Sequence, residues 1–196
     1  MINSIKIMLL RIIYGRKVSI KYKIKILGLL PYLKIPRDGK VILSKNVVIN
    51  SDFKNTNTAL TFRCKFVTGY EGIISVGENT MLNGACIVAY EKVEVGKDCQ
   101  IASSTIISDT DFHPVNPEIR LKQVRGESFS FSCVGKKSIK IGNNVWIGWN
   151  CTILKGVIIG DDCIVAAGSV VLAGNYPSGS LLAGNPAKVV KNYVIN

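Results

Sequence analysis

The second half of the chain carries an aliphatic residue at every sixth position, and this spacing predicts its architecture. The aliphatic positions are Ile141, Ile147, Ile153, Ile159, Val165 and Val171. A period of six fits neither an α-helix, which repeats every 3.6 residues, nor a strand with two alternating faces. It fits short strands joined by corners, and three such strands form one coil of a parallel β-helix.

The same spacing occurs earlier in the chain with less regularity. Hexads begin at Val76, Leu82, Val88 (with one extra residue), Val95, Ile101 and Ile107, and a fainter series begins at Leu43 and Ile49. Between residues 53 and 75 the period is degraded, so strand positions there are poorly defined. We therefore expect an all-β chain whose β-helix spans residues 41–180, followed by a C-terminal tail over 181–196.

The N-terminal segment is strongly basic. Residues 1–40 hold ten Lys or Arg and one Asp, a net charge of +9 out of the formal +12 of the chain. Within this short helix-and-strand segment, residues 2–13 are mostly apolar but too short and too charged to span a bilayer. Residues 18–26 alternate apolar and polar, which predicts a strand. The charge fits an anionic membrane or a solvated structural face better than nucleic acid, because no nucleic-acid-binding pattern accompanies it.

Four of the six cysteines occupy one position of the hexad. Cys86, Cys99, Cys151 and Cys163 each follow an aliphatic hexad opener by four residues, where a small apolar side chain would fill a corner of the coil. Buried cysteine behaves as a small hydrophobic residue. We therefore expect reduced core cysteines in a cytoplasmic protein, and no Cys-based zinc site, because no CxxC pair is present.

A stretch of about thirty residues, 109–138, interrupts the hexads and contains the single histidine of the chain, His113. A loop of this length inside a regular solenoid is often functional. Asp109 and Asp111 precede His113 at two-residue spacing, so an extended chain would place the three side chains on one face. A carboxylate beside an imidazole stabilises its protonated form, as a general base requires. A purely structural histidine is the alternative.

Three motifs combine with the hexads into a family resemblance. They are S-D-T-D-F-H-P at 108–114, N-N-V-W-I-G at 143–148 and A-G-N-P-A-K-V-V at 183–190. Together they resemble the hexapeptide-repeat O-acetyltransferases, notably those acting on galactosides, maltose, capsules, O-antigens and other polysaccharides. The resemblance implies a left-handed β-helix and a homotrimer that binds acetyl-CoA between subunits, acts on a sugar or glycan acceptor and uses no metal.

The resemblance also implies roles for individual residues. His113 would be the base, with Asp109 and Asp111 beside it. The candidate cofactor contacts are Trp146, Gly148, Ala167 and Lys188, and the candidate acceptor contacts are Asn83, Trp146 and Arg120. The chain departs from many relatives at Leu172-Ala173, where they carry Thr-Lys, so some cofactor contacts must differ.

We therefore predict an acetyl-CoA-dependent O-acetyltransferase. The basic N-terminal segment favours a polysaccharide or lipid-linked oligosaccharide acceptor, with peripheral contact to the inner face of the cell membrane. A γ-class carbonic anhydrase needs three histidine ligands for zinc, and one histidine excludes it. A nucleotide-sugar N-acyltransferase and a non-catalytic β-helix scaffold stay open as alternatives.

Overall fold

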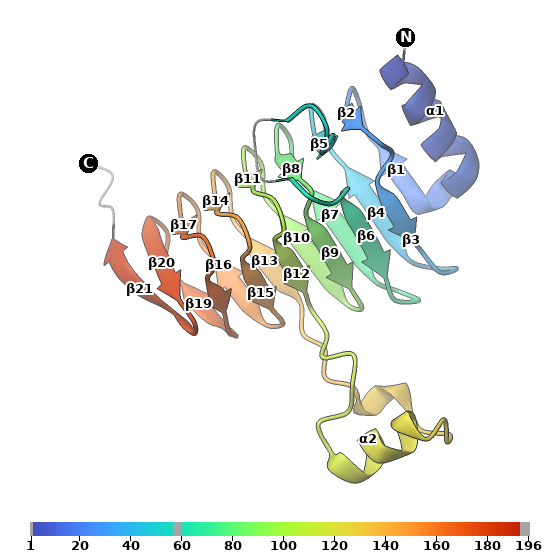
Figure 1. The fold of residues 1–196 in the computed structure, drawn as a ribbon, viewed down its shortest axis with the longest axis vertical. Coiled ribbons are helices and arrows are strands. Elements are labelled where there is room, and N and C mark those ends of the chain that lie inside the picture. The colour runs from blue at the N-terminus through green and yellow to red at the C-terminus, as the bar shows by residue number, and fades with distance from the viewer. Residues whose placement is uncertain (1, 57–59, 193–196) are drawn as a thin grey trace.

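The computed structural model describes residues 2–56 and 60–192, and it shows a three-sided prism of stacked β-coils (Figure 1). Each side of the prism is one sheet. Sheet A contains β1 (Val18–Ile20), β4 (Lys40–Leu43), β7 (Ile73–Val76), β10 (Lys92–Val95), β13 (Ile139–Ile141), β16 (Val157–Ile159) and β19 (Gly174–Tyr176). Sheet B contains β2 (Lys25–Gly28), β5 (Val48–Ser51), β8 (Met81–Asn83), β11 (Gln100–Ile101), β14 (Trp146–Ile147), β17 (Ile164–Val165), β20 (Ser180–Gly184) and β21 (Ala187–Asn192). Sheet C contains β3 (Tyr32–Lys34), β6 (Lys65–Thr68), β9 (Cys86–Ala89), β12 (Ile106–Ser108), β15 (Thr152–Leu154) and β18 (Val170–Val171).

Strands of successive coils pair in parallel, as a parallel β-helix requires. The predicted left-handed β-helix fold is confirmed. The hexad openers stack on one another inside the prism: Ile101 pairs with Ile147, which pairs with Val165, and all three side chains are buried. Strands buried along their inner face need an unbroken column of aliphatic side chains, and the six-residue period supplies one to each sheet.

The β-helix extends beyond the predicted range of 41–180 at both ends. Strands β1, β2 and β3 form a complete first coil that pairs with β4, β5 and β6. The alternating stretch 18–26 is therefore two strands with a corner between them, rather than one strand. At the other end, β20 continues sheet B and β21 pairs with it in antiparallel fashion, where a tail was expected.

The degraded stretch between 53 and 75 contains strands β6 and β7, and Phe66 is fully buried there. The hexads lose their phase because the connection from β5 to β6 is longer than a normal corner. The next corner between sheets B and C, from β8 to β9, is one residue shorter than the six-residue period requires. Ile87 rather than Val88 therefore pairs with Ile107. As a result Cys86, predicted to fill a corner, lies half-exposed on sheet C.

The corner between sheets A and B explains why glycine, and then Asn or Asp, follow the aliphatic opener of many hexads. Gly77, Gly96, Gly142 and Gly160 stack there. A Cβ on Gly96 would lie 2.2 Å from the carbonyl oxygen of Gly142, so only glycine fits. Two residues later, Asn79, Asp98, Asn144 and Asp162 adopt positive φ, which Asn and Asp tolerate better than most residues. Their side chains bond from coil to coil, as between Asn79 Nδ2 and Asp98 Oδ1 at 2.8 Å.

Helix α1 (Ile2–Tyr14) and the short 3₁₀ helix η1 (Gly15–Lys17) cover the open end of the first coil. Leu10 enters the core, and the Asn3 side chain bonds both the carbonyl of Ile24 and the N–H of Ile26. An unpaired strand edge must be covered or blocked, and α1 satisfies its backbone groups with side chains. None of the helices in the described parts of the chain is long and apolar enough to cross a membrane.

The cysteine environments predict an ordered pattern of chemical labelling. Cys133 is exposed and Cys86 half-buried, whereas Cys64, Cys99, Cys151 and Cys163 are buried. Burial raises the pKa of the Cys64 thiol to about 11 and shifts the other three buried thiols in the same direction. Since the thiolate is the reactive form, iodoacetamide should modify Cys133 first in the native protein, then Cys86, and the other four only after denaturation. Peptide mass spectrometry gives the order, and native labelling of Cys151 or Cys163 would contradict this packing.

Candidate active site

Residues 109–138 leave the solenoid as a lobe that projects from its side (Figure 1). The lobe contains α2 (Pro117–Val124) and the 3₁₀ helix η2 (Phe131–Cys133). Its two ends are joined at the solenoid surface. The Asp111 N–H donates to the Gly135 carbonyl and the Lys137 N–H donates to the Asp109 carbonyl, both at 2.9 Å. The lobe is therefore closed at its base and starts from a defined position.

The Asp109 carboxylate bonds the backbone of the solenoid rather than the imidazole of His113. Its carboxylate is fully buried and accepts the backbone N–H groups of Tyr90, Glu91 and Lys92 at 2.6–2.8 Å. Burial raises the pKa of Asp109, and the three hydrogen bonds oppose that shift. The carboxylate holds the turn that leads into β10, so a direct part for Asp109 in catalysis has no geometric support.

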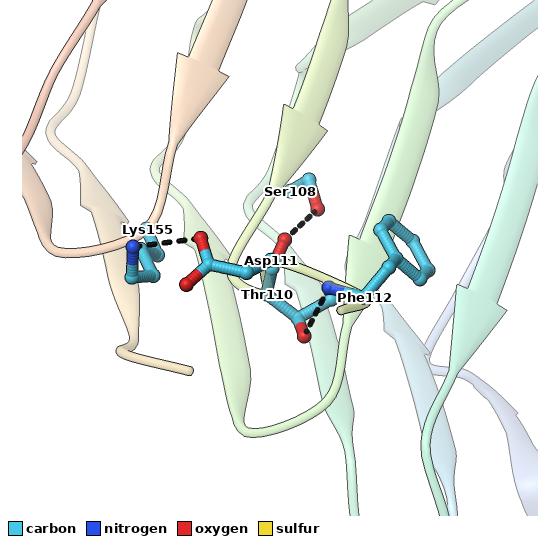
Figure 2. A network of polar contacts seen from close by, with 5 residues as sticks. All are labelled: Ser108, Thr110, Asp111, Phe112 and Lys155. Atoms are coloured by element: carbon cyan, nitrogen blue, oxygen red, sulfur yellow. Dashed lines mark hydrogen bonds and ion pairs between the residues drawn. The ribbon is translucent and has the colours of Figure 1, made fainter. Parts of the chain in front are cut away.

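Asp111 anchors the base of the lobe to the next coil. Its Oδ1 lies 2.7 Å from Nζ of Lys155, which follows β15 (Figure 2). Beside this pair, the Ser108 hydroxyl donates to the Thr110 carbonyl, and the Phe112 N–H donates to Thr110 Oγ1. Phe112 has a φ of 61°, which turns the chain. The predicted alignment of Asp109, Asp111 and His113 on one extended face is therefore wrong.

His113 is instead oriented by α2. Its Nδ1 lies 2.9 Å from Oε1 of Gln123, and the Gln123 amide nitrogen donates to the Phe112 carbonyl. The second bond fixes which end of the Gln123 amide faces the imidazole. An acceptor at Nδ1 requires the proton there, so the neutral ring keeps its lone pair on Nε2, and the His113 side chain is exposed. That arrangement suits a general base.

Helix α2 is built to hold this position. Asn116 caps its N-terminus by accepting the N–H groups of Glu118 and Ile119, and Pro117 occupies the first helical position. Arg120 donates to the carbonyls of Pro114 and Val115. Arg120, expected to contact an acceptor, thus fastens the segment that follows His113.

Three of the four predicted cofactor residues line one groove. Trp146, Gly148 and Ala167 border a cavity of about 450 Å³, together with Trp149 and Leu181. A Cβ on Gly148 would lie 2.6 Å from the backbone nitrogen of Ala167, so this position has no room for a side chain. Both tryptophans are about half exposed at the groove. Trp149 was not anticipated, although it stands next to the N-N-V-W-I-G motif.

Lys188 and Asn83 lie apart from the centre of the groove. Lys188 is exposed on β21 and pairs with Ala183 of β20, the strand that also carries Leu181. Asn83 ends β8, where it accepts from Asn50 at 3.1 Å and faces the Ile101 carbonyl at 3.4 Å. Asn83 would have to exchange these contacts to bind an acceptor. Among the residues that the structure describes, no cluster of three metal-ligating side chains occurs.

The groove and His113 belong to different corners of the prism. The groove lies where strands of sheet B lead into sheet C, whereas the lobe leaves where β12 of sheet C leads into β13 of sheet A. A three-residue strand of sheet C separates the two corners, roughly 10 Å of chain. The lobe also points away from the solenoid (Figure 1). Within one chain, the lobe and the groove are therefore separate features of the surface.

Comparison with known proteins agrees with this architecture. Residues 138–173 match a family model described as the hexapeptide repeat of succinyl-transferase. An Escherichia coli K12 protein named as a lipopolysaccharide biosynthesis O-acetyl transferase is 32% identical over 62% of this chain and 62% of its own length. The galactoside O-acetyltransferase of the same strain is 37% identical over 62% of this chain and 55% of its own. The match thus spans somewhat more than half of either relative.

A longer match and a solved structure complete the comparison. A protein of Staphylococcus aureus MRSA252, named as an acetyltransferase, is 30% identical over 74% of this chain and 67% of its own. A hexapeptide-repeat acetyltransferase of Vibrio cholerae, solved with acetyl coenzyme A, is 27% identical with a TM-score of 0.53 over 65% of this chain and 64% of that one. With its hexads, its lobe and these relatives, the chain belongs to the hexapeptide-repeat acetyltransferase family.

Proposed function

We propose that this protein transfers an acetyl group from acetyl-CoA to a hydroxyl group of a sugar, with His113 as general base. The observation that carries the proposal is the imidazole whose Nδ1 is bound by Gln123 and whose Nε2 is free to accept a proton. Nε2 would take the hydroxyl proton as the oxygen attacks the thioester carbonyl carbon. The carbon–sulfur bond then breaks, and CoA leaves as a thiolate that accepts the proton from His113.

The groove supports the cofactor assignment. A pantetheine arm is narrow and mostly apolar, and the cavity beside Trp146 and Trp149 offers apolar walls with Gly148 and Ala167 at its floor. Lys188 would meet the phosphates at the far end, where β21 carries it to the surface. The Vibrio cholerae relative was solved with acetyl coenzyme A, which favours the same ligand here.

We further propose a homotrimer in which the lobe of one subunit reaches the groove of the next. The separation of the two corners within one chain supports this assembly. The lobe also carries exposed apolar side chains, and α2 has no buried residue although Leu121 and Val124 lie on it. In the proposed trimer, the neighbouring subunit would cover these side chains.

The acceptor class rests on the relatives and on charge. The names of two relatives refer to galactosides and to lipopolysaccharide biosynthesis. A surface polysaccharide or a lipid-linked oligosaccharide would suit a basic enzyme, and six free cysteines suit the reducing cytoplasm, where acetyl-CoA would be used. Amine acceptors, as for a nucleotide-sugar N-acyltransferase, are the alternative that an acceptor screen would reveal.

Replacing the base gives a direct test. In His113→Ala, kcat for CoA release in the presence of a hydroxyl acceptor should fall on the order of 100-fold or more. Acetyl-CoA affinity, measured by calorimetry, should stay unchanged because the proposed cofactor contacts are the groove residues and Lys188, and His113 is not among them. Gln123→Ala should give a smaller loss, since it only frees the ring to rotate. Normal turnover in His113→Ala would remove the histidine from the mechanism.

Mixing two inactive chains tests the shared site. His113→Ala and Trp146→Ala chains, refolded together in equal amounts, should regain about one quarter of wild-type activity, because random assembly pairs an intact His113 with an intact Trp146 at that fraction of sites. The same variants refolded separately and then combined serve as the control. If co-refolded chains stay as inactive as the controls, both residues act within one chain.

The anchor of the lobe can be tested without any substrate. Lys155→Met removes the partner of Asp111, a partly exposed ion pair worth roughly 0.5–1 kcal/mol. Amides at the base of the lobe, such as those of Asp111 and Lys137, should then exchange with deuterium about two- to fivefold faster. Lys155→Arg should restore protection, and unchanged exchange in Lys155→Met would show that the backbone bonds alone hold the base.

A further inference from the structure

Helix α1 has two faces of different character. Its inner face carries Asn3, Lys6, Leu10 and Tyr14, whose side chains contact the first coil. Lys6 donates to the carbonyls of Ile26 and Gly28, so this basic residue belongs to the cap of the first coil. The inner face is therefore fully accounted for by the fold.

The outer face of α1 is apolar along its whole length. It consists of Ile2, Ile5, Met8, Leu9, Ile12 and Ile13, all of them exposed. Spacings of three and four residues place these side chains on one side of a helix. Ile2 is 70% exposed and Ile12 is 69% exposed, so the described chain covers neither. An uninterrupted apolar face of this kind marks a contact with another phase or molecule.

A basic rim borders this face. Arg11, Lys21 and Lys23 line a cavity of about 370 Å³ between α1 and the chain after β1, with Tyr22 half-exposed beside them. Lys23 lies over the Tyr22 ring at 5.8 Å. No acidic side chain in the described residues forms an ion pair with these three cations. Asp38 is the only acidic residue within 1–40, so this segment itself supplies little negative charge to offset the rim.

We propose that α1 docks on an anionic membrane, with its outer face inserted at the lipid interface and the Arg11–Lys21–Lys23 rim on lipid phosphates. Amphipathic helices with basic flanks bind in this way. The charge favours a bilayer over a second copy of the chain, because apposed copies would bring like-charged rims together. Helix α1 also lies at the extreme end of the solenoid, where a flat surface can reach it (Figure 1). This docking is independent of the acetyl-transfer chemistry.

Vesicle co-sedimentation of the full chain tests the proposal. The protein should bind vesicles of phosphatidylglycerol and phosphatidylcholine, ignore phosphatidylcholine alone, and dissociate as salt is raised. Arg11→Gln/Lys21→Gln/Lys23→Gln should lower the partition coefficient on the order of 100-fold. Ile5→Ser/Ile12→Ser should lower it at least tenfold, because both apolar side chains would lose their insertion. All the substituted side chains are exposed, so neither variant should alter the melting temperature appreciably.

Matched variants elsewhere in the chain distinguish binding through α1 from a general effect of positive charge or of exposed apolar side chains. Lys45→Gln/Lys97→Gln/Lys140→Gln removes as much exposed charge from the solenoid, and Ile158→Ser/Val190→Ser removes exposed apolar side chains from sheets A and B; both variants should bind vesicles like wild type. His113→Ala should also bind normally, which keeps docking apart from catalysis. Equal binding to neutral vesicles, equal losses in the matched variants, or a change of oligomeric state in lipid-free Ile5→Ser/Ile12→Ser would overturn the proposal.

Discussion

The structure depends on how closely one coil can approach the next at the corner between sheets A and B. At Gly96 and Gly142 the neighbouring backbone lies nearer than any Cβ would allow. This contact sets the stacking of the coils, and the positive φ at the Asn or Asp two residues later completes the turn. With the corner fixed, each strand pairs in register with the strand of the preceding coil, and the aliphatic hexad openers stack inside the prism.

This tight stacking explains how the protein can carry a large lobe without losing its fold. Strand β10 lies before the lobe and β13 after it, yet Val93 pairs directly with Ile139 and Val95 with Ile141. The strand register of sheet A therefore continues unchanged across the lobe. Two carboxylates make this possible: Asp109 fixes the turn before β10, and Asp111 ties the base of the lobe to the following coil. The rigid coil thereby becomes a platform from which α2 presents His113.

Periodicity predicted the solenoid well where corners have standard length, and poorly elsewhere. The first coil escaped notice because its corners break the six-residue period, which left only the alternation around Ile20 and Ile24. In the candidate site, the family resemblance named Trp146 and Gly148 in advance, and the structure places both on one groove. The sequence did not predict the contact of Gln123 with His113 or that of Lys155 with Asp111. Both contacts depend on the turn at Phe112, where φ is positive. A single backbone angle of that kind leaves no periodic trace in the sequence.

The two ends of the solenoid are closed differently, and this bears on its solubility. A stack of parallel coils is open-ended by construction, because the last coil offers the next chain the same edge that its own coils share. Antiparallel β21 covers the edge of sheet B at one end, and the Asn3, Lys6 and Tyr14 side chains of α1 bond backbone groups of the first coil at the other. These caps leave fewer free backbone groups for pairing with the end of another chain. A chain shortened by its first helix would therefore be expected to grow by stacking, like a filament that has lost its cap.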